Sequence, residues 1–452
     1  MKRVHAYLLI ATLLVCSVLA GCSHEFGLDP KKPVTLTLWH NYGGVMMATM
    51  DELLEAFNST VGKEKGIIIN CTSINSSAVL QEKLLMAAKG DPGAPELPDI
   101  TTCYPKVAIT LAEKGLLVDL NEYFSQDELS QYVTSFVNEG KFDGKLYVFP
   151  IAKSTEVLFL NQTLFDRFSR ATGVSVEGLS TFEGISEAAS RYYQWTDDQT
   201  PDVPNDGKAF FAVDSPFNLM QVAMEQLGSR FVEGQQLVTS GNVYGHIYEA
   251  LFEVAVKGGY AIYDGYSSDL SKTGDVLCSI GSTAGILFYG DTITYEDNVT
   301  ETVEYSVLPY PVFQGGKHVA IQRGGGMAVT CSGKTKEYAA AVFLKWFTAA
   351  GQNIKFVSET GYLPVTNAAF GTVMESEAET VANDNIRKLL KTAISMHKEY
   401  DFYIPPVFDE FDSLGREMES SFKSAARAAR DEYLILLETV DSGEAYRQVR
   451  TK

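Results

Sequence analysis

The sequence predicts an α/β protein in which strands and helices alternate along the chain. Short apolar runs typical of buried strands are followed by longer stretches whose apolar residues recur at helical spacing. Strands that alternate with helices favour parallel sheets, because a crossover helix returns the chain to the same edge. A chain of 452 residues, 45% hydrophobic and 21% charged, is typical of a soluble globular protein with two or three domains.

The first strand and helix organise this interpretation. Residues 36–42 are expected to form a buried strand, residues 50–58 a helix, and two glycines a short loop between them. Ligands in parallel sheets bind beyond the carboxyl ends of the strands, which would place Trp39 and Tyr42 at a ligand site. Core packing of Trp39 explains the local sequence equally well.

The later elements follow in the same alternation. Strands are expected at residues 66–70, 97–104, 144–151, 157–161, 210–214, 275–280, 305–311 and 323–330. Helices are expected at residues 78–89, 108–114, 127–132, 161–168, 181–195, 219–227, 248–257, 336–347, 386–398 and 411–437. The polar link 153–156 between two strands suits a crossing between domains, and the strand at 305–311 suits a crossing back. Small residues at 281–285 would let a helix N-terminus approach a ligand.

The N-terminus has the pattern of a targeting signal. A basic start and an apolar run at residues 6–18 precede Leu-Ala-Gly-Cys-Ser at 19–23, an order that resembles a bacterial lipobox. We expect a signal peptide at 1–21, lipid attachment at Cys22 and a lipid-anchored tether at 22–32. The alternative is an ordinary signal peptide with an incidental cysteine. No later segment is long and apolar enough to span a membrane.

The formal net charge of −20 argues against nucleic acid as a partner and against general adhesion to anionic lipid. The cysteines that remain after Cys22, which are Cys71, Cys103, Cys278 and Cys331, match no zinc spacing. Buried free thiols are expected, and a disulfide stays open in an extracytoplasmic protein. The sequence contains no phosphate loop, no H-E-x-x-H and no G-x-S-x-G motif, and it predicts no catalytic residue, metal site or cofactor.

Several aromatic and polar residues lie at predicted strand ends or turns. Sugar sites stack rings on the apolar faces of the sugar and bond its hydroxyls with planar polar groups. The candidate rings are Trp39, Tyr42, Tyr104, Phe217 and Tyr362, and the candidate polar partners are Asn41, Glu156, Asp214 and Asn218. For any single ring, core packing is about as good an explanation as ligand contact.

Several motifs occur together in one familiar order. They are Leu38-Trp39-His40, Pro98-Asp99-Ile100, Pro150 with the run 154–161, Gly281-Ser282, Gly324-Gly325-Gly326, the helix 340–347 and Gly361-Tyr362-Leu363-Pro364-Val365. In this order the chain resembles the bacterial extracellular solute-binding proteins (family 1) of carbohydrate ABC importers. The resemblance implies a two-lobe periplasmic-binding-protein-like (type II) fold, with the ligand in a cleft that closes by hinge bending. Lobe I would comprise residues 33–152 and 306–365, and lobe II residues 153–305 and 366–452.

Within the family the pattern is nearest to the glycerol-3-phosphate-binding branch. Ligand contacts carried over from that branch are Ser154, Ser282, Gly325 and Tyr362. The branch's phosphate-pairing arginine lies near the segment 397–405, which contains no arginine here. Because a phosphate requires a guanidinium or a comparable charge, a neutral sugar or oligosaccharide is favoured over a glycerophosphate.

The resulting hypothesis is a monomeric, lipid-anchored extracytoplasmic protein that captures a carbohydrate or polyol and delivers it to an ABC importer permease. Two other functions stay open on the sequence. One is a secreted carbohydrate-active hydrolase, which needs a compact pair of carboxylates that does not stand out in the sequence. The other is a binding protein that feeds a signalling receptor.

Overall fold

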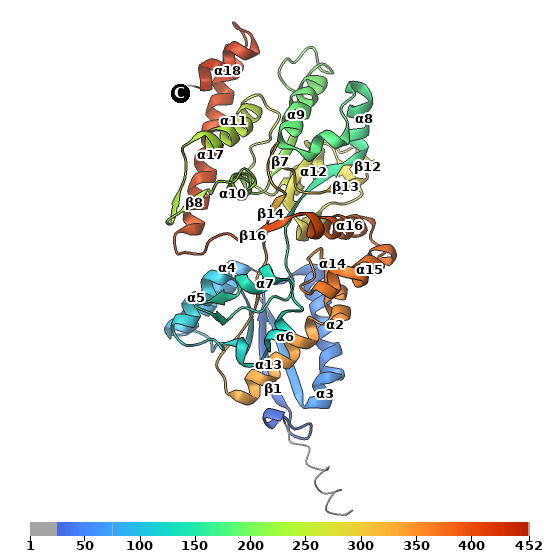
Figure 1. Ribbon diagram of the computed structural model, residues 1–452. Helices are drawn as coiled ribbons and strands as arrows, with labels where there is room; N and C mark the ends of the chain where they lie inside the picture. The colour runs from blue at the N-terminus through green and yellow to red at the C-terminus, as the bar shows by residue number, and fades with distance from the viewer. Residues whose placement is uncertain (1–24, 75, 451–452) are drawn as a thin grey trace, which may run out of the picture.

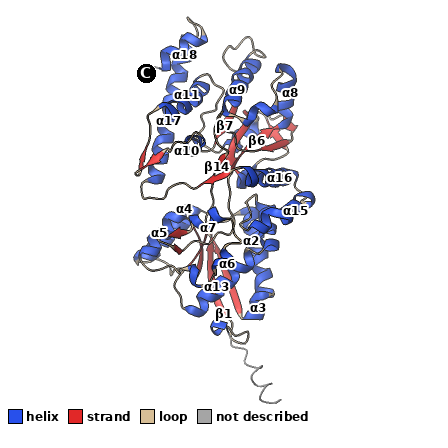
Figure 2. Ribbon diagram, in the orientation of Figure 1, coloured by secondary structure: helices blue, strands red, loops and turns tan. Residues whose placement is uncertain are grey.

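The computed structural model describes residues 25–74 and 76–450, which form two lobes joined by a narrow waist (Figure 1). The expected signal peptide and Cys22 lie outside the described residues. Within the described ranges, none of the helices combines the length and the apolar character that crossing a membrane requires. Helices lie on both sides of the strands in each lobe (Figure 2).

Lobe I is built on a sheet with the strand order β15-β3-β1-β2. Its strands are β1 (Val34–His40), β2 (Ile67–Ser73), β3 (Ile100–Cys103) and β15 (Gly326–Val329). Its helices are α2 (Gly44–Ser59), α3 (Val61–Lys65), α4 (Ser77–Lys89), α5 (Pro105–Glu113), α6 (Gln126–Leu129), α7 (Thr134–Glu139), α13 (Lys334–Phe347) and α14 (Ala350–Thr360). Strand β1 pairs in parallel with β2 and β3, as the alternation of strands and helices predicts.

Strand β1 has a different core on each face. Leu36, Leu38 and His40 are buried on one side of the strand. Trp39 points to the other side, where it packs against a smaller cluster that contains Leu80 of α4. The side-chain alternation of a strand predicts such a two-sided arrangement for a sheet that is covered by helices on both faces.

Lobe II is built on a sheet with the strand order β13-β6-β10-β7. Its strands are β6 (Glu156–Asn161), β7 (Ala209–Val213), β10 (Val276–Ser282) and β13 (Tyr305–Leu308). Its helices are α8 (Gln162–Thr172), α9 (Phe182–Asp197), α10 (Pro216–Gln226), α11 (Asn242–Val256), α12 (Ser267–Thr273), α17 (Phe411–Leu436) and α18 (Ser442–Arg450). Helices α15 (Met374–Thr380) and α16 (Asp384–Glu399) lie near the waist in Figure 1.

Short strand pairs complete the structure. They are β4 (Lys141–Phe142) with β5 (Lys145–Leu146), β8 (Val232–Glu233) with β9 (Gln236–Leu237), β11 (Thr292–Thr294) with β12 (Thr300–Thr302), and β14 (Val319–Ile321) with β16 (Asp401–Tyr403). The predicted strand at 144–151 is therefore replaced by a hairpin and an extended crossover. The turn after β10 begins a short 3-10 helix, Thr283–Phe288, where the sequence predicts a helix N-terminus.

Both main sheets are mixed rather than purely parallel, which differs from the sequence prediction. Strand β15 runs antiparallel to β3, and β6 and β13 run antiparallel to their neighbours. The physical reason is that β6 and β15 follow crossovers from the other lobe, so no local helix sets their direction. Residue 306 is the expected start of the second part of lobe I, but it lies in β13, which pairs with β6 in the lobe II sheet. The chain therefore crosses back to lobe I after β14.

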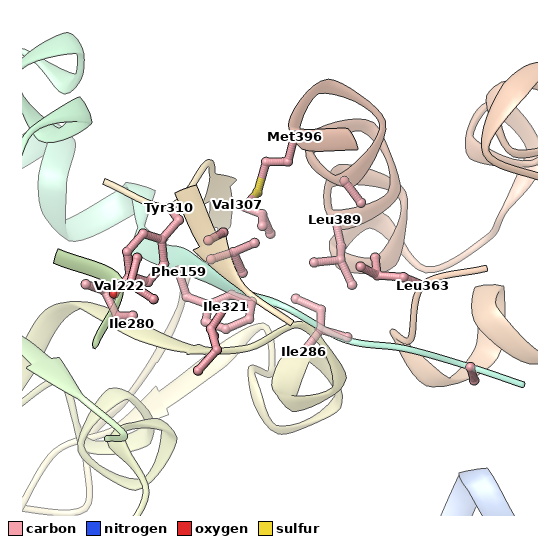
Figure 3. Close-up of a cluster of buried hydrophobic side chains, with 14 of the residues drawn as sticks. Phe159, Val222, Ile280, Ile286, Val307, Tyr310, Ile321, Leu363, Leu389 and Met396 are labelled. Atoms are coloured by element: carbon pink, nitrogen blue, oxygen red, sulfur yellow. The ribbon is translucent and has the colours of Figure 1, made fainter. Parts of the chain in front are cut away.

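Three extended segments cross the waist side by side. Ser154 bridges to Arg323, Lys153 bridges to Leu363, and Phe149 bridges to Met327. Leu363 lies with Ile286 and Leu389 at the edge of a buried cluster that extends to the lobe II core (Figure 3). These contacts bring the crossovers together at one place.

Candidate functional site

Two cavities open between the lobes, and Arg323 lines both of them. The first, of about 300 Å³, is lined by Tyr104 and Lys106 from lobe I, Asn218 from lobe II, and the segments 322–324, 405–408 and 411–412. The second, of about 440 Å³, is lined by Met46 from lobe I and by Asp214, Tyr266, Ser282 and Phe288 from lobe II. The interlobe cleft thus has two chambers that meet at one guanidinium.

Arg323 is held by both its backbone and its side chain. Its backbone N–H donates to the carbonyl of Ser154 at 2.8 Å and its carbonyl accepts from the Ser154 N–H at 3.1 Å. Its Nη1 lies 2.9 Å from Oε1 of Glu156, whose side chain is 1% exposed against 38% for Arg323. The Asn218 amide donates to the same Oε1 at 2.8 Å. The guanidinium is thereby fixed at the junction of the two chambers.

Glu156 is a buried carboxylate with one partnered oxygen. Burial raises the pKa of Glu156, Arg323 and Asn218 oppose the increase, and the nearby Asp214 charge adds to it. Its Oε2 is buried and has no hydrogen-bond partner among the described residues. Ionised Glu156 compensates the charge of Arg323, so the pair presents little net charge to the cleft.

The floor of the cleft contains a second buried ion pair. Lys153 Nζ lies 2.9 Å from Glu139 Oε2 and also donates to the carbonyl of Gly324 at 3.1 Å. The Gln322 amide donates to the same Glu139 oxygen. At the cleft mouth, Lys106 of α5 lies 3.3 Å from the Asp412 carboxylate of α17, which links the two lobes. Each lysine is therefore matched by a carboxylate.

Tyrosine rings form the lobe I side of the cleft. The rings of Tyr42 and Tyr362 meet edge to face with centroids 6.2 Å apart, and Tyr42 also packs on Phe356. Burial raises the pKa of Tyr104, while Arg323 and a hydrogen bond with Asn41 lower it. The Asn41 amide oxygen accepts from the Thr102 hydroxyl at 3.0 Å. This network holds the ring of Tyr104 beside Arg323.

The structure brings most of the sequence-predicted site residues together. Tyr104 and Asn218 line the first chamber, and Asp214 and Ser282 line the second. The others in this group adjoin them, and they are Asn41, Tyr42, Ser154, Glu156, Gly325 and Tyr362. A side chain at Gly325 would meet the backbone of Cys103, because its Cβ would lie 2.8 Å from the Cys103 oxygen.

Three of the predicted site residues are held by packing or hydrogen bonds to other parts of the protein. Trp39 is half-buried in the smaller lobe I cluster and lines neither chamber. Phe217 is buried between Phe231 and Phe411. Asp214 lines the second chamber, but its Oδ1 already accepts from the backbone N–H and the hydroxyl of Ser267.

The sequence reasoning missed several lining residues. Arg323 is the most important, and its position before a glycine run at a crossover is the one signal that could have identified it. Tyr266 and Phe288, 73% and 57% exposed, carry large rings into the second chamber without any motif. The prolines 405 and 406 line the first chamber next to Phe408.

One trio of potential metal ligands occurs among the described residues. Ligand atoms of His40, Asp51 and Cys71 lie within 4.8 Å of one another. The Tyr42 N–H donates to Nδ1 of His40 at 3.1 Å, so in the neutral ring the proton is on Nε2. The Nδ1 lone pair is thus used in a hydrogen bond and Nε2 carries the proton, so His40 has no free lone pair for a metal ion in this arrangement.

The four cysteines of the described residues are all free thiols. Cys103 and Cys278 are buried, as expected, while Cys71 is half-buried and Cys331 is exposed. Burial raises the pKa of Cys103 to about 12, which keeps this thiol protonated and unreactive at neutral pH.

Comparison with known proteins places the chain in a family. A family model described as bacterial extracellular solute-binding protein matches residues 52–384. No curated protein matches the chain. The chain is similar in fold to a cyclic alpha-maltosyl-1,6-maltose binding protein from Arthrobacter globiformis, with a TM-score of 0.69, 17% identity, and coverage of 92% of this chain and 97% of that chain.

It is also similar to UgpB from Mycobacterium tuberculosis in complex with glycerophosphocholine, with a TM-score of 0.67, 15% identity, and coverage of 92% and 97%. Maltose-bound MalE3 from T. maritima gives a TM-score of 0.63, 14% identity, and coverage of 92% and 97%. At these identities the likeness concerns the two-lobe α/β fold. Because the family model spans more than half of the sequence, this protein belongs to the bacterial extracellular solute-binding protein family.

Proposed function

We propose that this protein is a lipid-anchored binding protein that captures a neutral oligosaccharide outside the cytoplasm and delivers it to an ABC importer permease. Members of the family are extracellular binding proteins rather than enzymes, so the secreted hydrolase is not pursued further. The lipobox-like sequence at Cys22 supports the anchor.

The choice of a neutral ligand rests on one observation, which is that the positive charge of Arg323 is compensated by the Glu156 carboxylate. An anionic ligand needs a cation that is free to bind it. Arg323 pairs with Glu156, Lys106 with Asp412, and Lys272 with Asp269. Every cation that lines the two chambers, within the described residues, has a carboxylate partner. A neutral, hydroxyl-rich ligand can accept hydrogen bonds from these groups without leaving a buried charge unpaired.

The shape of the cleft supports an oligosaccharide rather than a single sugar. Two chambers of about 300 and 440 Å³ lie on either side of Arg323, and rings line both. A chain of sugar rings could occupy both chambers while Arg323 and Asn218 bond its hydroxyls at the junction. The residues proposed to contact or shape the ligand are Asn41, Tyr42, Tyr104, Ser154, Glu156, Asp214, Asn218, Ser282, Arg323, Gly325 and Tyr362, with Trp39 and Phe217 behind them.

A glycerophosphate-type ligand is the second candidate, because UgpB is described in complex with glycerophosphocholine. To bind Arg323, its phosphate group would have to break the ion pair between Arg323 and Glu156. The buried Glu156 carboxylate would then be left without its cationic partner. This cost, on the order of 1–3 kcal/mol for an unsatisfied buried group, disfavours the anion.

The test is thermal unfolding of the purified protein with a panel of neutral mono-, di- and oligosaccharides, polyols and glycerophosphodiesters. A ligand at about 100 times its dissociation constant adds roughly 2.7 kcal/mol to the free energy of unfolding, which gives a clear rise in melting temperature. We expect a neutral oligosaccharide to give the largest rise. Stabilisation by glycerophosphodiesters alone would instead support the second candidate, and no response to the whole carbohydrate panel would contradict the proposal.

The lipid anchor is tested separately by Cys22→Ala. The variant is expected to stay unprocessed or to appear in the soluble fraction, because it lacks the acylation site. If it remains membrane-bound at the normal mature size, the anchor assignment is wrong.

A further inference from the structure

A third cavity lies on lobe II, outside the interlobe cleft. This hairpin groove, of about 560 Å³, is bounded by α11, by α17 and by the β8–β9 hairpin. Its walls include Tyr244 and Tyr248 of α11 and Met418 and Phe422 of α17. None of its lining residues lines either chamber of the cleft. The groove is therefore a separate concavity, larger than each of the two chambers.

A ladder of aligned rings forms one wall of the groove. Tyr244 and Tyr248 are one helical turn apart and stack with centroids 5.8 Å apart and planes 28° apart. Phe231 continues the stack beyond Tyr244, and Phe252 continues it beyond Tyr248. The Tyr248 ring also meets the buried Phe422 edge to face at 5.8 Å. These contacts fix the two half-buried tyrosines in place before any ligand arrives.

Polar groups without protein partners surround these rings. Among the described residues, the Tyr244 and Tyr248 hydroxyls and the side chains of Gln235, Gln236 and Ser421 form no hydrogen bond with protein groups. Gln235 lies at the hairpin tip with a φ of 64°, a left-handed conformation that a residue with a side chain rarely adopts. Gly234 and Gln235 form the two-residue loop of this hairpin, and a positive φ at both, 54° at Gly234, is the geometry of a type I′ turn.

Among the residues that the structure describes, the groove is lined by one charged group, the exposed Glu417 carboxylate, and by no cation. Fixed tyrosine rings, two carboxamides and several hydroxyls suit a neutral ligand that alternates apolar faces with hydroxyl groups. We propose that the hairpin groove is a second carbohydrate site that binds an internal stretch of a neutral polysaccharide. It would hold the protein close to polymer whose shorter fragments reach the cleft, and its binding does not require that the cleft be occupied.

Affinity electrophoresis tests this site with the full chain. The wild-type protein is run in native gels that contain a soluble neutral glucan, mannan, xylan or galactan, and its mobility is compared with that in a polymer-free gel. We expect one polymer to slow the wild type. The double variant Tyr244→Ala/Tyr248→Ala should migrate as in the polymer-free gel, while Tyr263→Ala, which removes an exposed tyrosine ring outside the groove, should be slowed like the wild type.

A second variant controls for the case in which Tyr244→Ala/Tyr248→Ala does not fold correctly. Ser421→Trp fills the groove from an exposed position of α17 and leaves the ring ladder intact, so it should abolish the retardation at an unchanged melting temperature. Arg323→Ala, a cleft variant, should still be slowed. The proposal is overturned if no polymer slows the wild type, if Ser421→Trp is still slowed, or if Arg323→Ala alone loses the retardation.

Discussion

Arg323 and Glu156 are joined by a 2.9 Å ion pair that links a crossover segment to the first strand of the lobe II sheet. The two residues lie 167 positions apart in the sequence. The pair occupies the junction of the two chambers and compensates a charge that would otherwise favour anions. It therefore connects the geometry of the waist with the choice of ligand.

Glu156→Gln is expected to change the ligand preference. Glutamine keeps the shape of the side chain and an oxygen for the Asn218 amide, but it leaves the Arg323 charge uncompensated. We expect affinity for the neutral ligand to fall about tenfold, or roughly 1.4 kcal/mol, and affinity for glycerophosphodiesters to rise. Isothermal titration calorimetry at low ionic strength measures both. Glu187→Gln, which removes an exposed ion pair with Arg191, is the matched control, and equal effects of both variants would contradict the prediction.

Glu156 should also make stability depend on pH in a defined direction. Its folded-state pKa is raised by burial, so between the unfolded and folded pKa values the folded state binds a proton that the unfolded state has lost. Stability from this group is fully present below the unfolded pKa and is lost as the pH rises from there through the folded pKa. Urea unfolding between about pH 4 and pH 7 should show the wild type losing stability relative to Glu156→Gln as the pH rises. A constant difference between the two proteins across this range would contradict it.

Asp99 is expected to be a stability residue of lobe I. Its carboxylate accepts from the backbone N–H and hydroxyl of Thr37 and pairs with Lys336. Burial alone would raise the pKa of Asp99, but these partners lower it. Its contribution is therefore present above the unfolded pKa and is lost as the pH falls through the folded value. Asp99→Asn should cost about 1–3 kcal/mol in urea unfolding at neutral pH.

The control for this substitution is Asp202→Asn in an exposed loop, which should stay near the wild-type stability. Ligand affinity of Asp99→Asn should be unchanged at a temperature where the variant is folded. A variant as stable as the wild type, or one that loses affinity while fully folded, would show that the role of Asp99 is misassigned.

Trp39→Ala separates the two interpretations of the first strand. On the sequence, ligand binding should weaken with little loss of fold. The packing of Trp39 with Leu80 and its neighbours leads us to expect a stability loss of about 3 kcal/mol, the low end for a buried tryptophan because the ring is half-buried. Chemical unfolding without ligand and calorimetry with ligand measure the two effects independently. Unchanged stability with lost affinity would show instead that Trp39 contacts the ligand.

Elements with strong local signals could be predicted from the sequence. The helix expected at 78–89 is observed as Ser77–Lys89, where Ser76 caps its start and Gly90 ends it in a left-handed conformation. The strand ends also identified Tyr104, Asn218 and Ser282, because turns after strands of one sheet gather at one edge. Strand direction at the crossovers could not be predicted, since it depends on the path of a chain that leaves one lobe and returns.

The sequence by itself determined the alternation of strands and helices, the capped helix ends and the family, because these depend on local periodicity and on motifs read in order. The tertiary structure decided which charges remain free. Glu156, Asn218 and Arg323 come from three distant segments, and only the folded waist brings them within hydrogen-bonding distance. An arginine beside a glycine run predicts an anion site on its own, whereas a buried carboxylate 2.9 Å away makes the same position suited to a neutral ligand.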